Sequence, residues 1–177
     1  SGTSALTAQF LGVTPSTVEV NPFLADLIQA KVATYYVPAL ISALTHVCGI
    51  ARRSRSQAGT MIEALPATFI EPGVKGRWLF DYDVALEILR LRGAIAKLED
   101  PSIACLFRVI LGGLMTSFSN ATVSGKGRRY RVNWESRPVD PRSVLAAFSD
   151  AAAGAIGEID TFADRPVRKA TVLCGDS

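Results

Sequence analysis

Two short runs rich in β-branched residues, one near each end of the chain, restrict the fold more than any other feature. TVEV occupies residues 17–20, and TVLC occupies residues 171–174. The second run is nearly all apolar, which is typical of a strand buried in a parallel sheet. A buried strand cannot satisfy its backbone hydrogen bonds alone, so the two ends of the chain are expected to supply neighbouring strands.

The residues between these runs read mainly as helices, because good N-cap residues stand directly before prolines. Asn-Pro at 21–22 and Asp-Pro at 100–101 and 140–141 each start a stretch with apolar residues at helical spacing. Proline suits the first position of a helix, where its missing N–H group costs nothing. A further helix over 4–11 is predicted to end at Gly12.

The chain is therefore predicted to be an α/β protein in which a large, mainly helical insertion interrupts a sheet. At 177 residues it has room for one folding unit. We divide it into an α/β part over 1–34, a mainly helical insertion over 35–165 and a returning strand over 166–177.

Three features inside the insertion add detail to this prediction. Another helix is expected to begin at Asp81 or Asp83. Gly112 and Gly113 either weaken their helix or allow a neighbouring element to approach closely. The polar segment 117–127 is predicted to be an exposed loop, followed by a strand within 128–134.

The cysteines and the lone histidine give no sign of a metal site or a disulfide framework. Cys48, Cys105 and Cys174 lie far apart, and His46 is the only histidine. Each cysteine stands in an apolar run, where a small buried thiol is the ordinary interpretation. We therefore predict no metal and a reducing, cytoplasmic location, and we interpret His46 as a packed or capping residue.

One apolar stretch, residues 33–50, has about the minimum length of a membrane span and precedes a run of arginines. Pro38 and His46 interrupt it, however, and its apolar residues recur at helical spacing. We interpret it as a buried helix with one wetter face and predict no membrane contact. Arg52, Arg53 and Arg55 then fit the cationic end of that helix, with DNA contact as the second interpretation.

The opening residues have the spacing of a nucleotide-cofactor site. In doubly wound α/β folds a glycine turn approaches the cofactor, and a carboxylate about 20 residues later binds ribose hydroxyls. Gly2 and Glu19 fit this spacing, and a carboxylate can accept two hydrogen bonds from a vicinal diol. The geometry suits a nicotinamide cofactor as well as S-adenosylmethionine.

A resemblance distinguishes these cofactors. SGT at 1–3, VEVNPFLADLIQAK at 18–31 and TVLCGDS at 171–177 resemble the cofactor motifs of bacterial site-specific DNA methyltransferases that modify exocyclic amino groups, the adenine-N6 and cytosine-N4 type. This resemblance implies a partial Rossmann-like sheet that binds S-adenosylmethionine. Glu19 would bind the ribose, residues 21–23 would form the wall beside the adenine, and Asp176 would lie near the adenine amino group. The implied cofactor contacts are Ser1, Gly2, Thr3, Glu19, Asn21, Pro22, Phe23 and Asp176.

The resemblance extends to residues 81–100 and 117–131, which are similar to a helical segment and a basic loop that some of these enzymes carry; the second ends in the basic segment SGKGRRYR at 124–131. In such a segment cations can neutralise DNA phosphates while an aromatic ring stacks or hydrogen-bonds. A solvated basic loop is the alternative interpretation, since the net charge of the whole chain is only +3. The implied DNA contacts are Lys126, Arg128, Arg129, Tyr130 and Arg131.

The catalytic motif of that family, Asp, Asn or Ser followed by Pro-Pro-Tyr or Pro-Pro-Phe, has no counterpart here, because the chain contains no Pro-Pro pair. Residues 21–23 lack the second proline, and we interpret them as a helix start. We therefore assign no catalytic residue and expect a fragment cut at both ends, whose partner is the remainder of its own methyltransferase domain. The choice between adenine and cytosine, the recognition sequence and any restriction partner stay open.

Two other functions remain open at this stage. A non-catalytic helical module could bind nucleic acid or a protein through the basic segment. A nicotinamide enzyme would need a GxGxxG motif whose first part precedes residue 1. The methyltransferase hypothesis requires TVEV and TVLC to be adjacent parallel strands, with the carboxylates at 19 and 176 on one edge.

Overall fold

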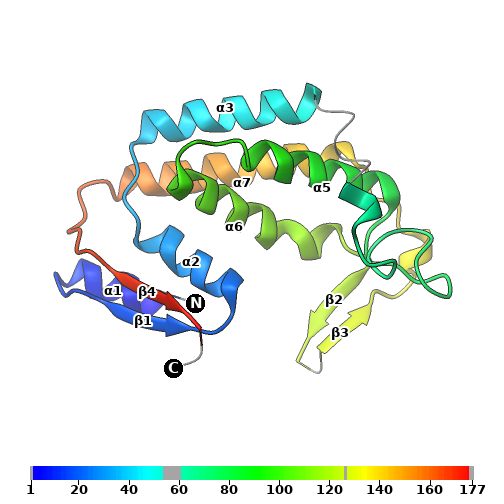
Figure 1. Ribbon diagram of the computed structural model, residues 1–177, viewed down its shortest axis with the longest axis horizontal. Coiled ribbons are helices and arrows are strands. Elements are labelled where there is room, and N and C mark those ends of the chain that lie inside the picture. Colours follow the sequence, from blue (N-terminus) through cyan, green and yellow to red (C-terminus); the bar gives the residue numbers. More distant parts are fainter. Residues whose placement is uncertain (1, 54–60, 126, 176–177) are drawn as a thin grey trace.

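The computed structural model describes residues 2–53, 61–125 and 127–175, which form a mixed α/β structure with a helical body and two small sheets (Figure 1). The elements in chain order are α1 (Thr3–Phe10), β1 (Ser16–Glu19), α2 (Pro22–Val32), α3 (Val37–Arg53), α5 (Tyr82–Ile95), α6 (Pro101–Phe118), β2 (Ala121–Ser124), β3 (Gly127–Tyr130), the 3-10 turn η1 (Trp134–Ser136), α7 (Arg142–Thr161) and β4 (Thr171–Cys174).

The two ends of the chain meet in one sheet, as the sequence predicts. β1 and β4 are adjacent and parallel, with a register that runs from Ser16 opposite Thr171 to Glu19 opposite Cys174. In Figure 1 the red strand β4 lies beside the blue strand β1, although the whole helical body separates them in sequence.

The burial of β4 differs from the prediction. Val172 packs on a small cluster formed by Ala5 of α1 with Ile28 and Val32 of α2. Leu173 on the other face is 56% exposed, so the strand is buried on one side only within the described residues. An apolar run fixes strand character, but what covers its faces depends on the elements around it.

Local capping chemistry sets the bounds of the first two helices as predicted. α1 ends in a Schellman motif, in which Gly12 has a φ of 73° and the Gly12 and Val13 N–H groups donate to carbonyls of the last turn. α2 begins at Pro22, and the Asn21 side chain accepts hydrogen bonds from the N–H groups of Phe23 and Leu24, the second and third residues of the helix.

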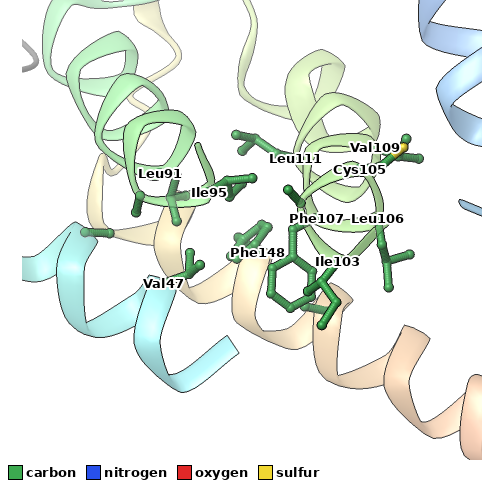
Figure 2. Packing of buried hydrophobic residues seen from close by; sticks show 14 of the residues in the cluster. Val47, Leu91, Ile95, Ile103, Cys105, Leu106, Phe107, Val109, Leu111 and Phe148 are labelled. Carbon is green, nitrogen blue, oxygen red and sulfur yellow. The ribbon is translucent and has the colours of Figure 1, made fainter. Parts of the chain in front are cut away.

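The helical body has one core, built by α3, α5, α6 and α7. Its centre is an edge-to-face contact between Phe107 of α6 and Phe148 of α7, whose ring centroids are 5.8 Å apart (Figure 2). Leu40, Leu91 and Val144 are also almost fully buried in this cluster. Burying a side chain of this kind contributes about 1.5–3 kcal/mol, so these few residues hold the four helices together.

The apolar helices α3 and α6 both contribute to the core of the helical body. α3, which contains most of the membrane-like stretch, buries Leu40, Val47 and Ala51 along one face. Within the described residues, α6 is the helix long and apolar enough to cross a membrane. It packs against α2, α5 and α7, and its most apolar face supplies the centre of the core.

The segment after α6 differs most from the prediction. Residues 121–124 and 127–130 pair as the antiparallel strands β2 and β3, where an exposed loop is predicted for 117–127. Ser119 and Asn120 are buried, and the Asn120 N–H donates to the Leu79 carbonyl at 2.7 Å. These polar residues can be buried because their polar groups have hydrogen-bond partners in the fold. The polar composition of the segment does not indicate these partners.

Smaller predictions have mixed outcomes. Asp81 stands at the N-cap position of α5, but its carboxylate accepts hydrogen bonds from Trp78 Nε1 and Asn120 Nδ2 and makes no side-chain cap. α7 begins at Arg142, one residue later than the Asp-Pro start suggests. His46 is exposed on α3, contrary to its predicted packing.

Candidate functional site

The edge of the β1–β4 sheet at the carboxyl ends of both strands carries the first set of predicted site residues. Glu19 is the last residue of β1, and its Oε1 accepts a hydrogen bond from the Asn21 N–H at 3.1 Å. The Gly175 N–H donates to the Glu19 carbonyl at 3.2 Å, which draws the chain after β4 to the same edge. Asp176, the second predicted carboxylate, and Ser1 lie outside the described residues.

The glycine turn at the start of α1 lies at this same end of the sheet. Gln9, in the last turn of α1, bonds to the Val32 and Arg168 carbonyls, and Arg168 stands shortly before the amino end of β4. α1 therefore ends near the amino edge of β4, and its first turn lies toward the carboxyl edge. Gly2 and Thr3 are thus placed at the end of the sheet where Glu19 lies.

Gly2 is required there for two separate reasons. Its φ of 73° is in the left-handed region that residues with a Cβ rarely adopt. A Cβ at this position would also lie only 3.0 Å from Ile28 Cγ1 of α2. The turn consequently holds α1 close to α2 and fixes the direction in which the chain approaches the sheet edge.

Residues 21–23, predicted to form the adenine wall, have visible structural tasks. Asn21 caps α2, Pro22 is its first residue, and the Phe23 ring contacts the backbone of Gly112 in α6. The Phe23 side chain remains 40% exposed, so one part of the ring still faces solvent.

The predicted basic segment is the hairpin β2–β3, which projects from the helical body in Figure 1. Arg128 and Arg129 are exposed on β3, where phosphates could reach them, while Lys126 lies outside the described residues. Arg131 is different, because its Nε donates to the Ser119 carbonyl at 3.1 Å and its Nη2 to the Thr116 carbonyl at 2.8 Å.

Arg131 therefore completes the carboxyl end of α6, a structural role that the DNA-contact prediction overlooked. Arg137, absent from the sequence-based set, does the same by donating to the Ser117 and Ser119 carbonyls. Cations are favoured at a helix C-terminus, where carbonyls lack partners. No sequence signal finds this pair, because both arginines cap a helix that ended more than ten residues earlier.

An aromatic cluster at the base of the hairpin was also missed by sequence reasoning. The Tyr130 ring lies 5.2 Å from the Trp134 ring, and Trp134 meets Trp78 edge-to-face at 4.9 Å. The Arg77 guanidinium lies 5.9 Å from the Tyr130 ring centroid. Tyr130 thus contacts the Trp134 ring and the Arg77 cation, so its packing holds the hairpin base in addition to any contact with nucleic acid.

Comparisons with protein-family models, curated proteins and solved structures found no match for the chain. Within the described parts of the chain, no group of three or more histidine, cysteine, aspartate or glutamate side chains is placed to hold a metal ion. Function must therefore be argued from the sheet edge and the hairpin themselves.

Proposed function

We propose that the chain is part of an S-adenosylmethionine-dependent DNA methyltransferase that modifies an exocyclic amino group of adenine or cytosine. In this proposal α1, β1, α2 and β4 belong to a Rossmann-like cofactor-binding sheet. The supporting observation is the parallel β1–β4 pair, with Glu19 at its carboxyl edge and the Gly2 turn at the same end.

This geometry favours a nucleoside cofactor for a physical reason. Ligands of open α/β sheets bind beyond the carboxyl ends of parallel strands, where loops diverge. Glu19 ends β1 with a half-buried side chain, so its carboxylate can accept the charge-assisted bonds of a ribose diol without being fully desolvated. The Gly175 N–H, which donates to the Glu19 carbonyl, holds the end of β4 at that edge.

The hairpin supplies the proposed contact with DNA. Arg128 and Arg129 are exposed cations that can neutralise phosphates and release counterions. Methyl transfer itself requires the target amino nitrogen to attack the methyl carbon in line with the carbon–sulfur bond that breaks, with the base extruded from the duplex. Since the chain has no Pro-Pro motif to hold that base, we propose that it positions the cofactor and contacts the DNA backbone, and that the remainder of the methyltransferase domain holds the base.

Cofactor binding tests this proposal directly. Titration calorimetry with S-adenosylhomocysteine on the 177-residue chain is expected to show binding that Glu19→Gln weakens at least tenfold, because charge-assisted bonds are lost. Glu158→Gln on α7 is the matched control, since this exposed acid lies away from the sheet edge. Absent binding, or equal loss in both variants, would refute the assignment of Glu19.

Turnover tests the second part of the proposal. The chain, incubated with methyl-labelled S-adenosylmethionine and duplex DNA, is expected to incorporate no label. Clear incorporation would show that the catalytic residues lie within these 177 residues. We also propose a cytoplasmic location, because all three cysteines are free in the structure and suit a reducing compartment.

One observation favours a second candidate, a non-catalytic helical module that binds nucleic acid or a protein. The helices α3, α5, α6 and α7 supply most of one large core, and the basic hairpin projects from it. DNA binding that persists without any binding of S-adenosylhomocysteine would favour this alternative over the methyltransferase.

A further inference from the structure

A half-open hollow of about 360 Å³ lies between α5, the end of α6, the hairpin and the segment before α5. α5 contributes Ile88 and Leu89, and α6 contributes Met115. Phe69 and Phe80 close the side formed by the segment before α5. This volume falls in the range of pockets that hold small organic ligands.

The wall of the hollow is mostly apolar, and its uncharged polar side chains are Thr116, Ser119 and Thr122. Its lining contains no aspartate or glutamate. Among its polar side chains, Ser119 is already committed, because its hydroxyl accepts from the Ala121 N–H and donates to the Ala121 carbonyl. An occupant with many polar atoms would therefore lose more hydrogen bonds to water than these few polar groups can replace.

Two cations border this apolar surface. Arg92, near the end of α5, and Arg128, on β3, both line the hollow and are exposed. The ion pairs in the described residues join Arg90 with Glu87 and Arg108 with Asp26, and neither Arg92 nor Arg128 takes part in one. Both guanidinium groups are thus free, within the described chain, to receive an external anion.

We propose that this hollow binds a small apolar carboxylate, with the hydrocarbon part against Ile88, Leu89 and Met115 and the carboxylate between Arg92 and Arg128. Apolar walls favour hydrocarbon by about 25 cal/mol for each Å² removed from water. Guanidinium groups bind carboxylates in a planar, bidentate geometry. A nucleotide fits less well, because the polar edges of its base would meet apolar side chains.

Decanoate is a suitable probe, and Met115 is a suitable reporter. The chain has only two methionines, Met61 and Met115, and only Met115 lines the hollow. In a chain labelled with ¹³C-methyl methionine, decanoate is expected to shift the Met115 methyl resonance saturably, with a Kd on the order of 100 μM for a ligand of this size. Met61→Leu assigns the two resonances.

Charge selectivity separates this proposal from simple apolar binding. Decanol and decylammonium share the hydrocarbon, and each is expected to bind at least about tenfold more weakly than decanoate. Adenosine monophosphate, an anion with a polar base, is expected to leave Met115 unchanged. The proposal would be overturned if decanol bound with the same affinity as decanoate. It would also be overturned if decanoate up to millimolar concentration did not shift the Met115 resonance.

Two arginine variants complete the test without altering the core. Arg92→Gln and Arg128→Gln are each expected to weaken decanoate binding about 1.5-fold to fivefold, the range for exposed ion pairs. Arg129→Gln is the matched control, because Arg129 is equally exposed on the same strand but does not line the hollow. Equal weakening by Arg129→Gln and Arg128→Gln would show that general charge, and not this hollow, attracts the anion.

Discussion

The Phe23 ring of α2 lies against the backbone of Gly112 in α6, so closely that a Cβ on Gly112 would fall 2.3 Å from Phe23 Cε2. This contact joins the α/β end of the molecule to the helical body. The adjacent Gly113 has nothing within 4 Å of the equivalent position. Two neighbouring glycines in one helix thus have opposite environments.

Gly112→Ala is expected to be less stable than Gly113→Ala by about 1–2 kcal/mol. Both alanines gain up to about 1 kcal/mol of helix propensity, but only the Cβ at 112 must displace the Phe23 ring. The ring is 40% exposed and can move outward, which keeps the difference moderate. Urea unfolding followed by circular dichroism measures it.

A double variant tests the cause of this difference. If Phe23 produces the clash, adding Gly112→Ala to a Phe23→Ala chain should change its stability by the same amount as Gly113→Ala changes that of the original chain. Equal stabilisation by both alanines in the original chain would contradict the close contact.

Gln9 is a second point of connection, and Gln9→Leu is expected to destabilise the chain by about 2 kcal/mol or more. Its fully buried Nε2 donates to the Val32 carbonyl at 3.0 Å and to the Arg168 carbonyl at 2.7 Å. Leucine has a similar size but leaves both carbonyls unpaired, each at a cost of about 1–3 kcal/mol, and it offsets only one such cost by removing the Gln9 Oε1, which is buried without a partner in the described residues. Gln29→Leu, at an exposed position of α2, is the control and should change stability by less than about 0.5 kcal/mol. Chemical denaturation of the two variants provides the comparison, and equal effects would refute the role of Gln9.

The helix starts could be predicted from the sequence because their causes are local. Asn21 and Asp100 each cap a helix within three residues of their own position, and proline follows both. The pairing of the two terminal strands could also be predicted, since a buried strand must have a neighbour. Both inferences need only short-range chemistry or a general rule about backbone hydrogen bonds.

The hairpin and its support could not be predicted in this way. Asn120 is buried because it bonds to Leu79 and Asp81, about 40 residues earlier in the chain. Aspartate is a common N-cap residue, yet the Asp81 carboxylate accepts hydrogen bonds from the Trp78 and Asn120 side chains instead. The roles of these residues depend on partners that are distant in sequence, and residue spacing does not indicate such partners.

The residues of the candidate site likewise include some whose position could be predicted and some whose role could not. The sequence predicts a strand that ends near Glu19, which places this residue at the edge of a sheet. In the structure Glu19 is the last residue of β1. The capping role of Arg131 depends on where the end of α6 lies in space, so a charge pattern grouped it with Arg128 and Arg129. Basic residues in one sequence cluster can therefore have different physical roles.

Arg131→Gln is expected to reduce stability by about 1–2 kcal/mol, whereas Arg129→Gln should change it by less than about 0.5 kcal/mol. Arg131 satisfies carbonyls at the end of α6, and its loss leaves them to water or unpaired. Arg129 is exposed, and surface charges contribute little. Thermal unfolding of both variants measures the difference. If Arg131→Gln were as stable as the original chain, its bonds to α6 would carry no net energy.

The three cysteines are expected to react with iodoacetamide in the order of their exposure, with Cys174 first. Cys174 ends β4 and is exposed, while Cys48 and Cys105 are buried. Burial raises the pKa of the Cys105 thiol, the Asp26 carboxylate adds to this effect, and the Arg108 guanidinium opposes it. Since the thiolate is the nucleophile, a raised pKa lowers the reactive fraction of Cys105 further at pH 8. Peptide mass spectrometry over time should therefore show Cys174 alkylated in the native chain, and Cys105 only after urea unfolds it. Alkylation of Cys105 at the rate of Cys174 under native conditions would mean that α6 does not pack on α2 as the structure describes.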